Sequence, residues 1–246
     1  MAHRTTAILS IAAVLALAAS AAAGQSCPEP LRDARRLVLV TAGGMATSAA
    51  TMQLFRRASP NDRWQRIGES APARIGRAGM AWGHPFLRLR REGEPVKLEG
   101  DKRAPAGIYS IGRSFGFTAS RRHNHLRLTR QTVCVDDAGS PAYNTITSRR
   151  IVGAKVHAER MGTSPNYRQG LVVDYPTNAA ARAGSCIFVH VWRSPDRPTA
   201  GCVALSEARV KALQDFAAAG AVLAILPAEA LRRLPGCLPA GAEALN

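Results

Sequence analysis

The stretch IFVHVWRSPDRPTAGCVAL, residues 187–205, joins two short apolar segments through a loop rich in turn residues. If IFVHVW is a strand, its aliphatic residues face one side, while His190 faces the other together with Phe188 and Trp192. The aliphatic side suits a core, which directs the imidazole toward a cleft or a second packed layer. The loop RSPDRPTAG contains too much Pro, Gly, Ser and Asp to continue the strand, and it ends at Cys202.

His190 and Cys202 form a candidate catalytic pair, because the intervening loop is long enough to bring imidazole and thiol together. A free thiol with a pKa near 8.5 is only a few per cent thiolate at neutral pH. An adjacent imidazolium that lowers this pKa by about two units would make the nucleophilic thiolate the major form. Gly201 allows an unusual backbone conformation, and the N–H groups beside the thiol are candidates for an oxyanion hole. The alternative is a buried or disulfide-bonded cysteine with a hydrogen-bonded core histidine.

Short segments of branched and aromatic residues, separated by Gly, Pro, Asn and Asp, predict a mainly β fold built from antiparallel sheets. The expected strands are RLVLVT (36–41), TMQLFRR (51–57), FLRLR (86–90), GIYSIG (107–112), HLRLT (125–129), LVVDY (171–175) and IFVHVW (187–192). Apolar residues at helical spacing predict a helix with Ser206 as its N-cap and Gly220 at its end. A strand over 221–226 and a short helix within 227–234 follow.

An apolar run over residues 7–19 follows His3 and Arg4 and leads into SAAAG, the pattern of a secretory signal peptide. We therefore expect residues 1–23 to be a signal peptide and residues 24–246 to form a single domain. The run is shorter than the roughly 20 residues of a membrane-spanning helix, and no similar run follows. This predicts a soluble protein without a membrane span, in the periplasm or outside the cell.

Five cysteines in an exported chain indicate disulfides, and the odd number leaves at least one thiol unpaired. Cys27 and Cys237 lie near the two ends of the mature chain and are the first expected pair, since termini often lie close together. For Cys186 we expect a buried thiol or a bridge to Cys134, with a regulatory pairing to Cys202 as the alternative.

The formal net charge is +16, from 33 Lys and Arg against 17 Asp and Glu, and it favours polyanionic partners. The arginines are spread along the chain, and no nucleic-acid recognition motif accompanies them. We therefore expect an anionic cell-wall surface, and no nucleic acid, as the partner of this charge. The candidate pair has no nearby C-x-x-C or H-x-x-x-H spacing, so no metal is expected there.

At the turn TAGC (199–202) the sequence resembles the L,D-transpeptidase catalytic domain, the YkuD-like family. The signature of that family is a histidine followed by a loop and a Ser/Thr-x-Gly-Cys turn, and His190 matches the histidine. The stretches EGDKRAPAGIYSIGRSFGF, CVDDAGSPAYN and YRQGLVVDY look like other parts of one branch of the family. Many members have His where this chain has Ala200, and Arg or Asn where it has Ala204.

The resemblance implies an antiparallel, sandwich-like L,D-transpeptidase catalytic fold with a helix after Cys202, and it implies no metal or organic cofactor. The substrates would be peptidoglycan stem peptides. Cys202 would attack the L-centre carbonyl of diaminopimelate in a tetrapeptide stem, and D-Ala would leave with a proton from His190. A diaminopimelate amine of a neighbouring stem would then accept the acyl group. With water as acceptor the activity would be an L,D-carboxypeptidase, and a non-catalytic cell-wall binding protein of the same fold is the other alternative.

Further candidate residues surround this pair. Those expected to contact the substrate or to shape its cleft are Trp192, Arg193, Thr199, Tyr143 and Asn144. Tyr143 and Asn144 match a Tyr-Asn pair of the resembling branch, for which either a cleft-wall or a loop-fixing role is expected. Either Asp174 or a backbone carbonyl is expected to orient the His190 ring.

Overall fold

The structure, a computed structural model, describes residues 27–242, so the predicted signal peptide lies outside the described range. The strands are β1 Arg36–Ala42, β2 Ala49–Arg56, β3 Gln65–Arg74, β4 Met80–Trp82, β5 Ala104–Gly116, β6 Leu126–Arg127, β7 Thr132–Val135, β8 Ile146–Ser148, β9 Ala158–Arg160, β10 Gln169–Asp174, β11 Phe188–Val191, β12 Val203–Leu205 and β13 Val222–Pro227. The helices are α1 Glu29–Arg32, α2 Arg149–Val152 and α3 Glu207–Ala217, with 3-10 helices η1 His84–Leu89, η2 Pro165–Arg168 and η3 Ala228–Arg233. The prediction of a mainly β fold is confirmed.

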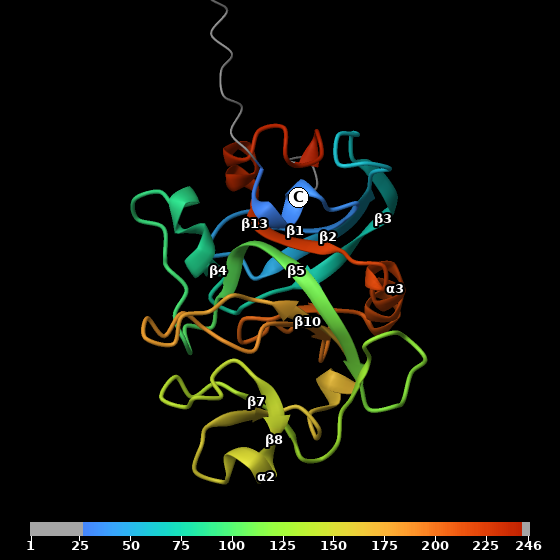
Figure 1. The fold of residues 1–246 in the computed structure, drawn as a ribbon. Coiled ribbons are helices and arrows are strands. Elements are labelled where there is room, and N and C mark those ends of the chain that lie inside the picture. Colours follow the sequence, from blue (N-terminus) through green and yellow to red (C-terminus); the bar gives the residue numbers. More distant parts are fainter. Residues whose placement is uncertain (1–26, 243–246) are drawn as a thin grey trace, which may run out of the picture.

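The larger sheet closes on itself to form a barrel (Figure 1). Its strands pair in the order β10-β11-β12-β3-β2-β1-β13-β5, and β5 pairs again with β10. Most of these ladders are antiparallel, whereas β1–β13 and β11–β12 are parallel. The expected sandwich-like sheet is thus a closed ring, because the β5–β10 pairing satisfies the backbone groups of the two strands that would otherwise be edges.

The main apolar core fills the barrel. All six residues of β13 are buried, and β1 is buried beyond its first residue. Leu31 of α1 and Leu231 of η3 belong to the same core, so short helices at the two ends of the described chain cover this part of the barrel. The parallel β1–β13 pair is therefore covered on both faces, which explains its continuous apolar sequence.

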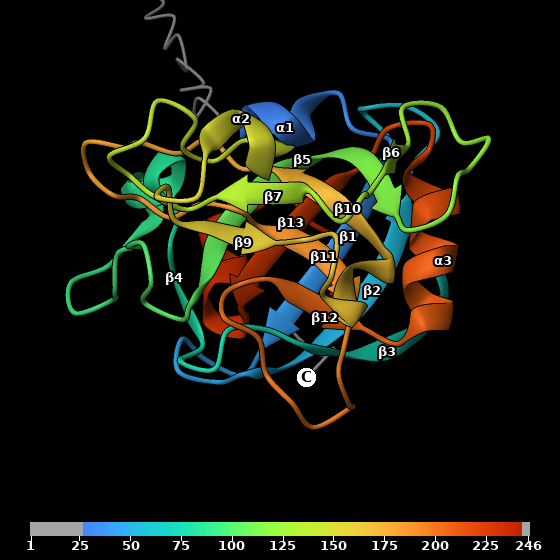
Figure 2. The ribbon, with the colours of Figure 1, turned by 90° about the horizontal axis from the view of Figure 1, so that it is seen from below.

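A small sheet, with β7 between β8 and β9, lies beside the barrel (Figures 1 and 2). A second apolar cluster joins it to the barrel. Its buried members are Phe115, Leu128, Cys134, Met161, Tyr167, Cys186, Phe188 and Cys202. The disulfide Cys134–Cys186 links β7 to the segment just before β11, as the bridging alternative predicted.

Helix α3 follows the candidate cysteine, as expected. The Ser206 side chain accepts a hydrogen bond from Arg209 N at 3.4 Å, which caps the helix. Buried Gln214 donates from Nε2 to Phe115 O at 3.1 Å and to Gly170 O at 2.9 Å. Because Phe115 and Gly170 are partners in the β5–β10 ladder, this side chain fastens the helix across the strand pair that closes the barrel. No helix of residues 27–242 has both the length and the apolarity to cross a bilayer.

The expected strand over 86–90 is wrong, since this segment belongs to the 3-10 helix η1. Pro85 lies in its first turn, and Phe86 and Leu89 are its buried residues. The backbone departs from helical geometry at Phe86, with φ −114° and ψ 15°, and the side chains of Phe86 and Leu89 both join the main core. The segment 125–129 is a strand only at Leu126–Arg127.

The disulfide Cys27–Cys237 confirms the expected pair and joins residues 210 apart in sequence. We expect the C27S/C237S double variant to lose about 2–5 kcal/mol of unfolding free energy, because the bond no longer restricts the unfolded chain. Urea unfolding followed by circular dichroism measures this, with Cys202→Ala as the control that leaves both disulfides intact. An unchanged urea midpoint in the double variant would contradict the prediction.

Candidate active site

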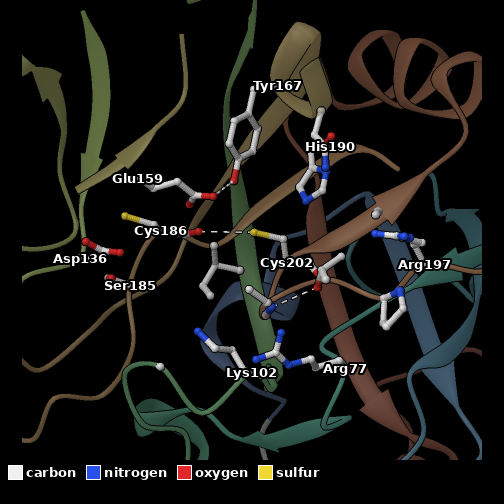
Figure 3. A pocket seen from close by; sticks show the side chains of 18 of the residues that line it. Arg77, Lys102, Asp136, Glu159, Tyr167, Ser185, Cys186, His190, Arg197 and Cys202 are labelled. Carbon is white, nitrogen blue, oxygen red and sulfur yellow. Dashed lines mark hydrogen bonds between the residues drawn. The ribbon is translucent and has the colours of Figure 1, made fainter. Parts of the chain in front are cut away.

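A cavity of about 750 Å³ opens beside β11 and β12, and both members of the candidate pair line it (Figure 3). The other predicted residues in its lining are Trp192, Arg193, Thr199 and Gly201. The structure therefore brings together the pair, the signature turn and three of the five predicted substrate contacts, Trp192, Arg193 and Thr199.

The parallel pairing of β11 with β12 places His190 and Cys202 on one face. His190 pairs with Ala204, and Cys202 lies two residues before Ala204, beside Phe188. Side chains alternate along each strand, so all four residues point to the same side of the sheet. The Phe188 N–H donates to Cys202 Sγ at 3.4 Å, which holds the sulfur against β11.

Thr199 holds the turn that carries the cysteine. Its Oγ1 donates to Cys202 O at 2.7 Å and accepts from Gly201 N at 3.0 Å. Its backbone N–H donates to Ile75 O, and its carbonyl accepts from Arg77 N, each at 2.9 Å. Thr199 thus positions Cys202 and anchors the turn to the segment that follows β3.

The predicted oxyanion hole is reduced to one of its two N–H groups. The Gly201 N–H is engaged by Thr199 Oγ1 and is not available to a substrate oxygen. The Cys202 N–H donates to no described residue, so it remains the candidate donor. A single preorganised donor is still a substantial contribution to stabilising an oxyanion.

The His190 ring is oriented by the backbone. Its Nδ1 lies 2.9 Å from Val191 O, and since a carbonyl only accepts, Nδ1 carries the proton and Nε2 is free to act as a base. Burial lowers the pKa of His190 to about 4, so the ring is neutral at neutral pH. Asp174 does not perform this role, because it lies on β10 and lines a different hollow.

The Cys202 thiol is also neutral in this structure. Burial raises its pKa well above the ordinary value, and the nearby Glu159 carboxylate adds to the increase. The thiol donates to Cys186 O at 3.5 Å, and no hydrogen bond joins it to the His190 ring. The expected imidazolium–thiolate pair is therefore not the resting state, because burial disfavours both charged forms. The predicted nucleophilic role of Cys202 would require the thiol to lose its proton during the attack.

Tyr143 and Asn144 are not among the residues that line this cavity. Asn144 accepts at Oδ1 from Cys186 N at 2.9 Å and donates from Nδ2 to Tyr175 O at 3.0 Å. The Tyr143 hydroxyl donates to Glu99 Oε2 at 2.6 Å. These contacts fit the loop-fixing role, since they hold the segment just before β11.

The sequence patterns did not indicate the charged walls of the cavity (Figure 3). Acidic side chains in the lining are Glu99, Asp136, Glu159 and Asp196, and basic ones are Arg77, Lys97, Lys102, Arg193 and Arg197. Lys97 is paired with Asp101 at 2.6 Å, so it is largely neutralised. The cavity thus offers sites for both signs of charge. In residues 27–242, no three or more His, Cys, Asp or Glu side chains gather in a way that would hold a metal ion.

No family model and no curated protein matches this chain. Among solved structures, it is similar to the helical cell shape determining protein Pgp2 from Campylobacter jejuni, with 12% sequence identity and a TM-score of 0.43. The alignment covers 78% of this chain and 48% of that one, so the chain spans about half the length of the structure that it matches.

Gly201 has a φ of +151°, and a Cβ at this position would lie 3.0 Å from Arg103 O. We expect Gly201→Ala to cost on the order of 1–3 kcal/mol of stability and to change the iodoacetamide labelling rate of Cys202 several-fold, because the turn must shift. Gly220→Ala is the matched control, with a φ of +84° and open space around the added Cβ. If both variants alter the labelling equally, the tight fit of Gly201 does not position the thiol.

Burial of the Cys202 thiol also predicts how its rate of iodoacetamide labelling depends on pH. Iodoacetamide should modify Cys202 at neutral pH on the order of tenfold or more slowly than free cysteine, because only the thiolate reacts and burial raises the thiol pKa. The rate should keep rising with pH above the range where free cysteine levels off. Mass spectrometry of the labelled peptide measures both rates. A plateau already reached near pH 7 would instead indicate the imidazolium–thiolate pair.

Proposed function

We propose that this protein is a cysteine-dependent L,D-transpeptidase that acts on peptidoglycan peptides. The observation that carries the proposal is a free thiol and a correctly oriented neutral imidazole on one wall of one cavity. Cys202 is the one free cysteine of residues 27–242, since the other four form two disulfides. It ends the TAGC turn, which resembles the signature of the family.

In the first half-reaction, Cys202 Sγ attacks the L-centre carbonyl of diaminopimelate in a tetrapeptide stem. Nε2 of His190 takes the thiol proton, and the Cys202 N–H stabilises the developing oxyanion. The C–N bond breaks, D-Ala leaves with that proton, and a thioester remains on the sulfur.

In the second half-reaction, an amine of a neighbouring stem attacks the thioester while Nε2 of His190 takes its proton. The C–S bond breaks, the proton returns to the sulfur, and a peptide cross-link has formed. Water in place of the amine gives a hydrolysed tripeptide stem, which is the L,D-carboxypeptidase alternative.

The charges of the cavity suit this substrate class. A diaminopimelate stem carries free carboxylates and, on its side chain, an amine. Exposed Arg193 and Arg197 line the cavity, where they can meet a carboxylate. Figure 3 shows Asp136 and Glu159, which provide negative charge, on the opposite side of the cavity from Arg197. A nucleic acid offers negative charge alone, so the acidic wall favours a peptide of mixed charge.

The remaining features fit a protein that works outside the cytoplasm. Two disulfides are typical of an oxidising compartment, the periplasm or the cell exterior. A net charge of +16 would hold the protein near anionic wall polymers.

Cys202→Ala is expected to abolish the acyl-enzyme adduct and the release of D-Ala from a tetrapeptide substrate, because no other free thiol is available. His190→Gln should slow turnover by on the order of a hundredfold or more, the usual contribution of a positioned general base. Mass spectrometry of the protein and of purified muropeptides detects the adduct, D-Ala, and the cross-linked or hydrolysed product.

Circular dichroism of both variants provides the control for folding. Release of D-Ala at the normal rate by a folded Cys202→Ala variant would exclude the proposed chemistry. Binding of wall polymers without any adduct in the wild-type protein would instead support the non-catalytic alternative.

A further inference from the structure

Tyr167 is a buried residue that touches both members of the catalytic pair. Its ring packs edge-on against the His190 ring, with 5.2 Å between the ring centroids. Its hydroxyl donates to Glu159 Oε1 at 2.5 Å and also interacts with the Cys202 thiol. Figure 3 shows the tyrosine hydroxyl pointing toward the Glu159 carboxylate, with the Cys202 sulfur below both. Thiol, phenol and carboxylate therefore form one chain of polar groups inside the cavity.

Glu159 is held in place by the small sheet. It lies on β9 opposite Cys134 of β7, and Cys134 is bonded to Cys186, whose carbonyl accepts from the Cys202 thiol. The position of the Glu159 carboxylate relative to Cys202 is therefore set by the small sheet and its disulfide, and not by β11 or His190. This arrangement places a second proton acceptor on the other side of the sulfur.

We propose that Tyr167 and Glu159 form a second proton path from Cys202, which acts beside His190 in the acylation step. At rest the Cys202 thiol donates to Cys186 O, so its S–H first turns toward Tyr167. The S–H bond then breaks as the proton moves to the Tyr167 oxygen, while the Tyr167 proton moves to Glu159. The tyrosine is regenerated, Glu159 becomes a neutral acid, and the thiolate attacks the carbonyl. When D-Ala departs, the same path runs backward and delivers the proton to its nitrogen. The inference rests on Cys202 being the nucleophile of the proposed transpeptidase.

The relative basicity of the two acceptors supports this path. Burial raises the pKa of Glu159, whereas burial lowers the pKa of His190 to about 4. Burial therefore strengthens proton binding at Glu159 and weakens it at His190. The other charged groups that act on Glu159 are Asp136 and Glu99, which raise its pKa further, and Lys102, which lowers it.

Two nearly isosteric substitutions test the path. Tyr167→Phe removes the hydroxyl but keeps the ring against His190, and Glu159→Gln keeps an acceptor for the tyrosine but cannot take a proton. We expect each to slow acylation by about 10–100-fold, and the double variant to be no slower than either one, because both interrupt the same path. Tyr109→Phe is the matched control, since it removes a buried tyrosine hydroxyl outside the cavity lining.

The pH profile separates a proton path from a structural role. Ionised Glu159 is needed to accept the thiol proton, so the wild-type acylation rate should fall at acid pH as Glu159 becomes protonated. In Glu159→Gln this acid limb should move to lower pH, toward the pKa of His190. A merely structural contact would lower the rate without moving the limb.

Normal acylation and an unmoved acid limb in folded Tyr167→Phe would overturn the proposal, even if Glu159→Gln failed to fold. The result is distinguishable from a failure of the proposed function. If Cys202→Ala loses all acylation while the Tyr167 and Glu159 variants remain normal, only the second path is wrong. If Cys202→Ala keeps acylation, the nucleophile itself is wrong.

Discussion

The parallel pairing of β11 with β12 is the constraint on which the site depends. Parallel neighbours need a crossover connection, ordinarily of a dozen or more residues. Here the connection is residues 192–202, about as short as such a crossover can be. This connecting loop is held by Thr199, whose backbone hydrogen bonds to Ile75 and Arg77 tie the loop to the segment after β3. Because the register of this ladder is fixed, the side chains of His190 and Cys202 lie on the same face of the sheet.

Burial then determines the chemistry of that face. The small sheet packs over the end of β11 and removes thiol and imidazole from water, which leaves both uncharged. The packing that creates the cavity thus disfavours a preformed imidazolium–thiolate pair. The proposed reaction therefore needs acceptors that take the thiol proton only during the attack. The proposed acceptors are Nε2 of His190 and the Tyr167–Glu159 pair.

The sequence predicted the parts of the site that depend on local pattern. The alternation of side chains in IFVHVW predicted the face on which His190 lies. The composition of the loop RSPDRPTAG predicted that the chain turns back and brings Cys202 near His190. Strand β3 was missed because its sequence, QRIGESAPAR, is mostly polar and contains Gly68 and Pro72, so it has little alternation to detect. Closure of the barrel was missed as well, since pairing of β5 with β10 is a tertiary contact without a local signal.

The protonation state and the Glu159–Tyr167 pair could not be predicted for the same reason. Both depend on how deeply the small sheet buries the thiol, and β9 is a three-residue strand, AER, that no pattern distinguishes from a loop. What places Glu159 is its pairing with Cys134, and what places Cys134 is its bond to Cys186.

The Cys134–Cys186 disulfide makes the structure of the cavity depend on the redox conditions around the protein. The acidic wall of the cavity, with Asp136 and Glu159, comes from the small sheet, whereas Arg193 and Arg197 come from the return loop of the barrel. In the proposed function, a stem peptide that contacts both groups of charges would lie across the Cys202 sulfur. The Cys134–Cys186 bond joins the small sheet to the segment just before β11. Oxidising conditions that preserve this disulfide therefore also preserve the covalent attachment of the acidic wall to the barrel.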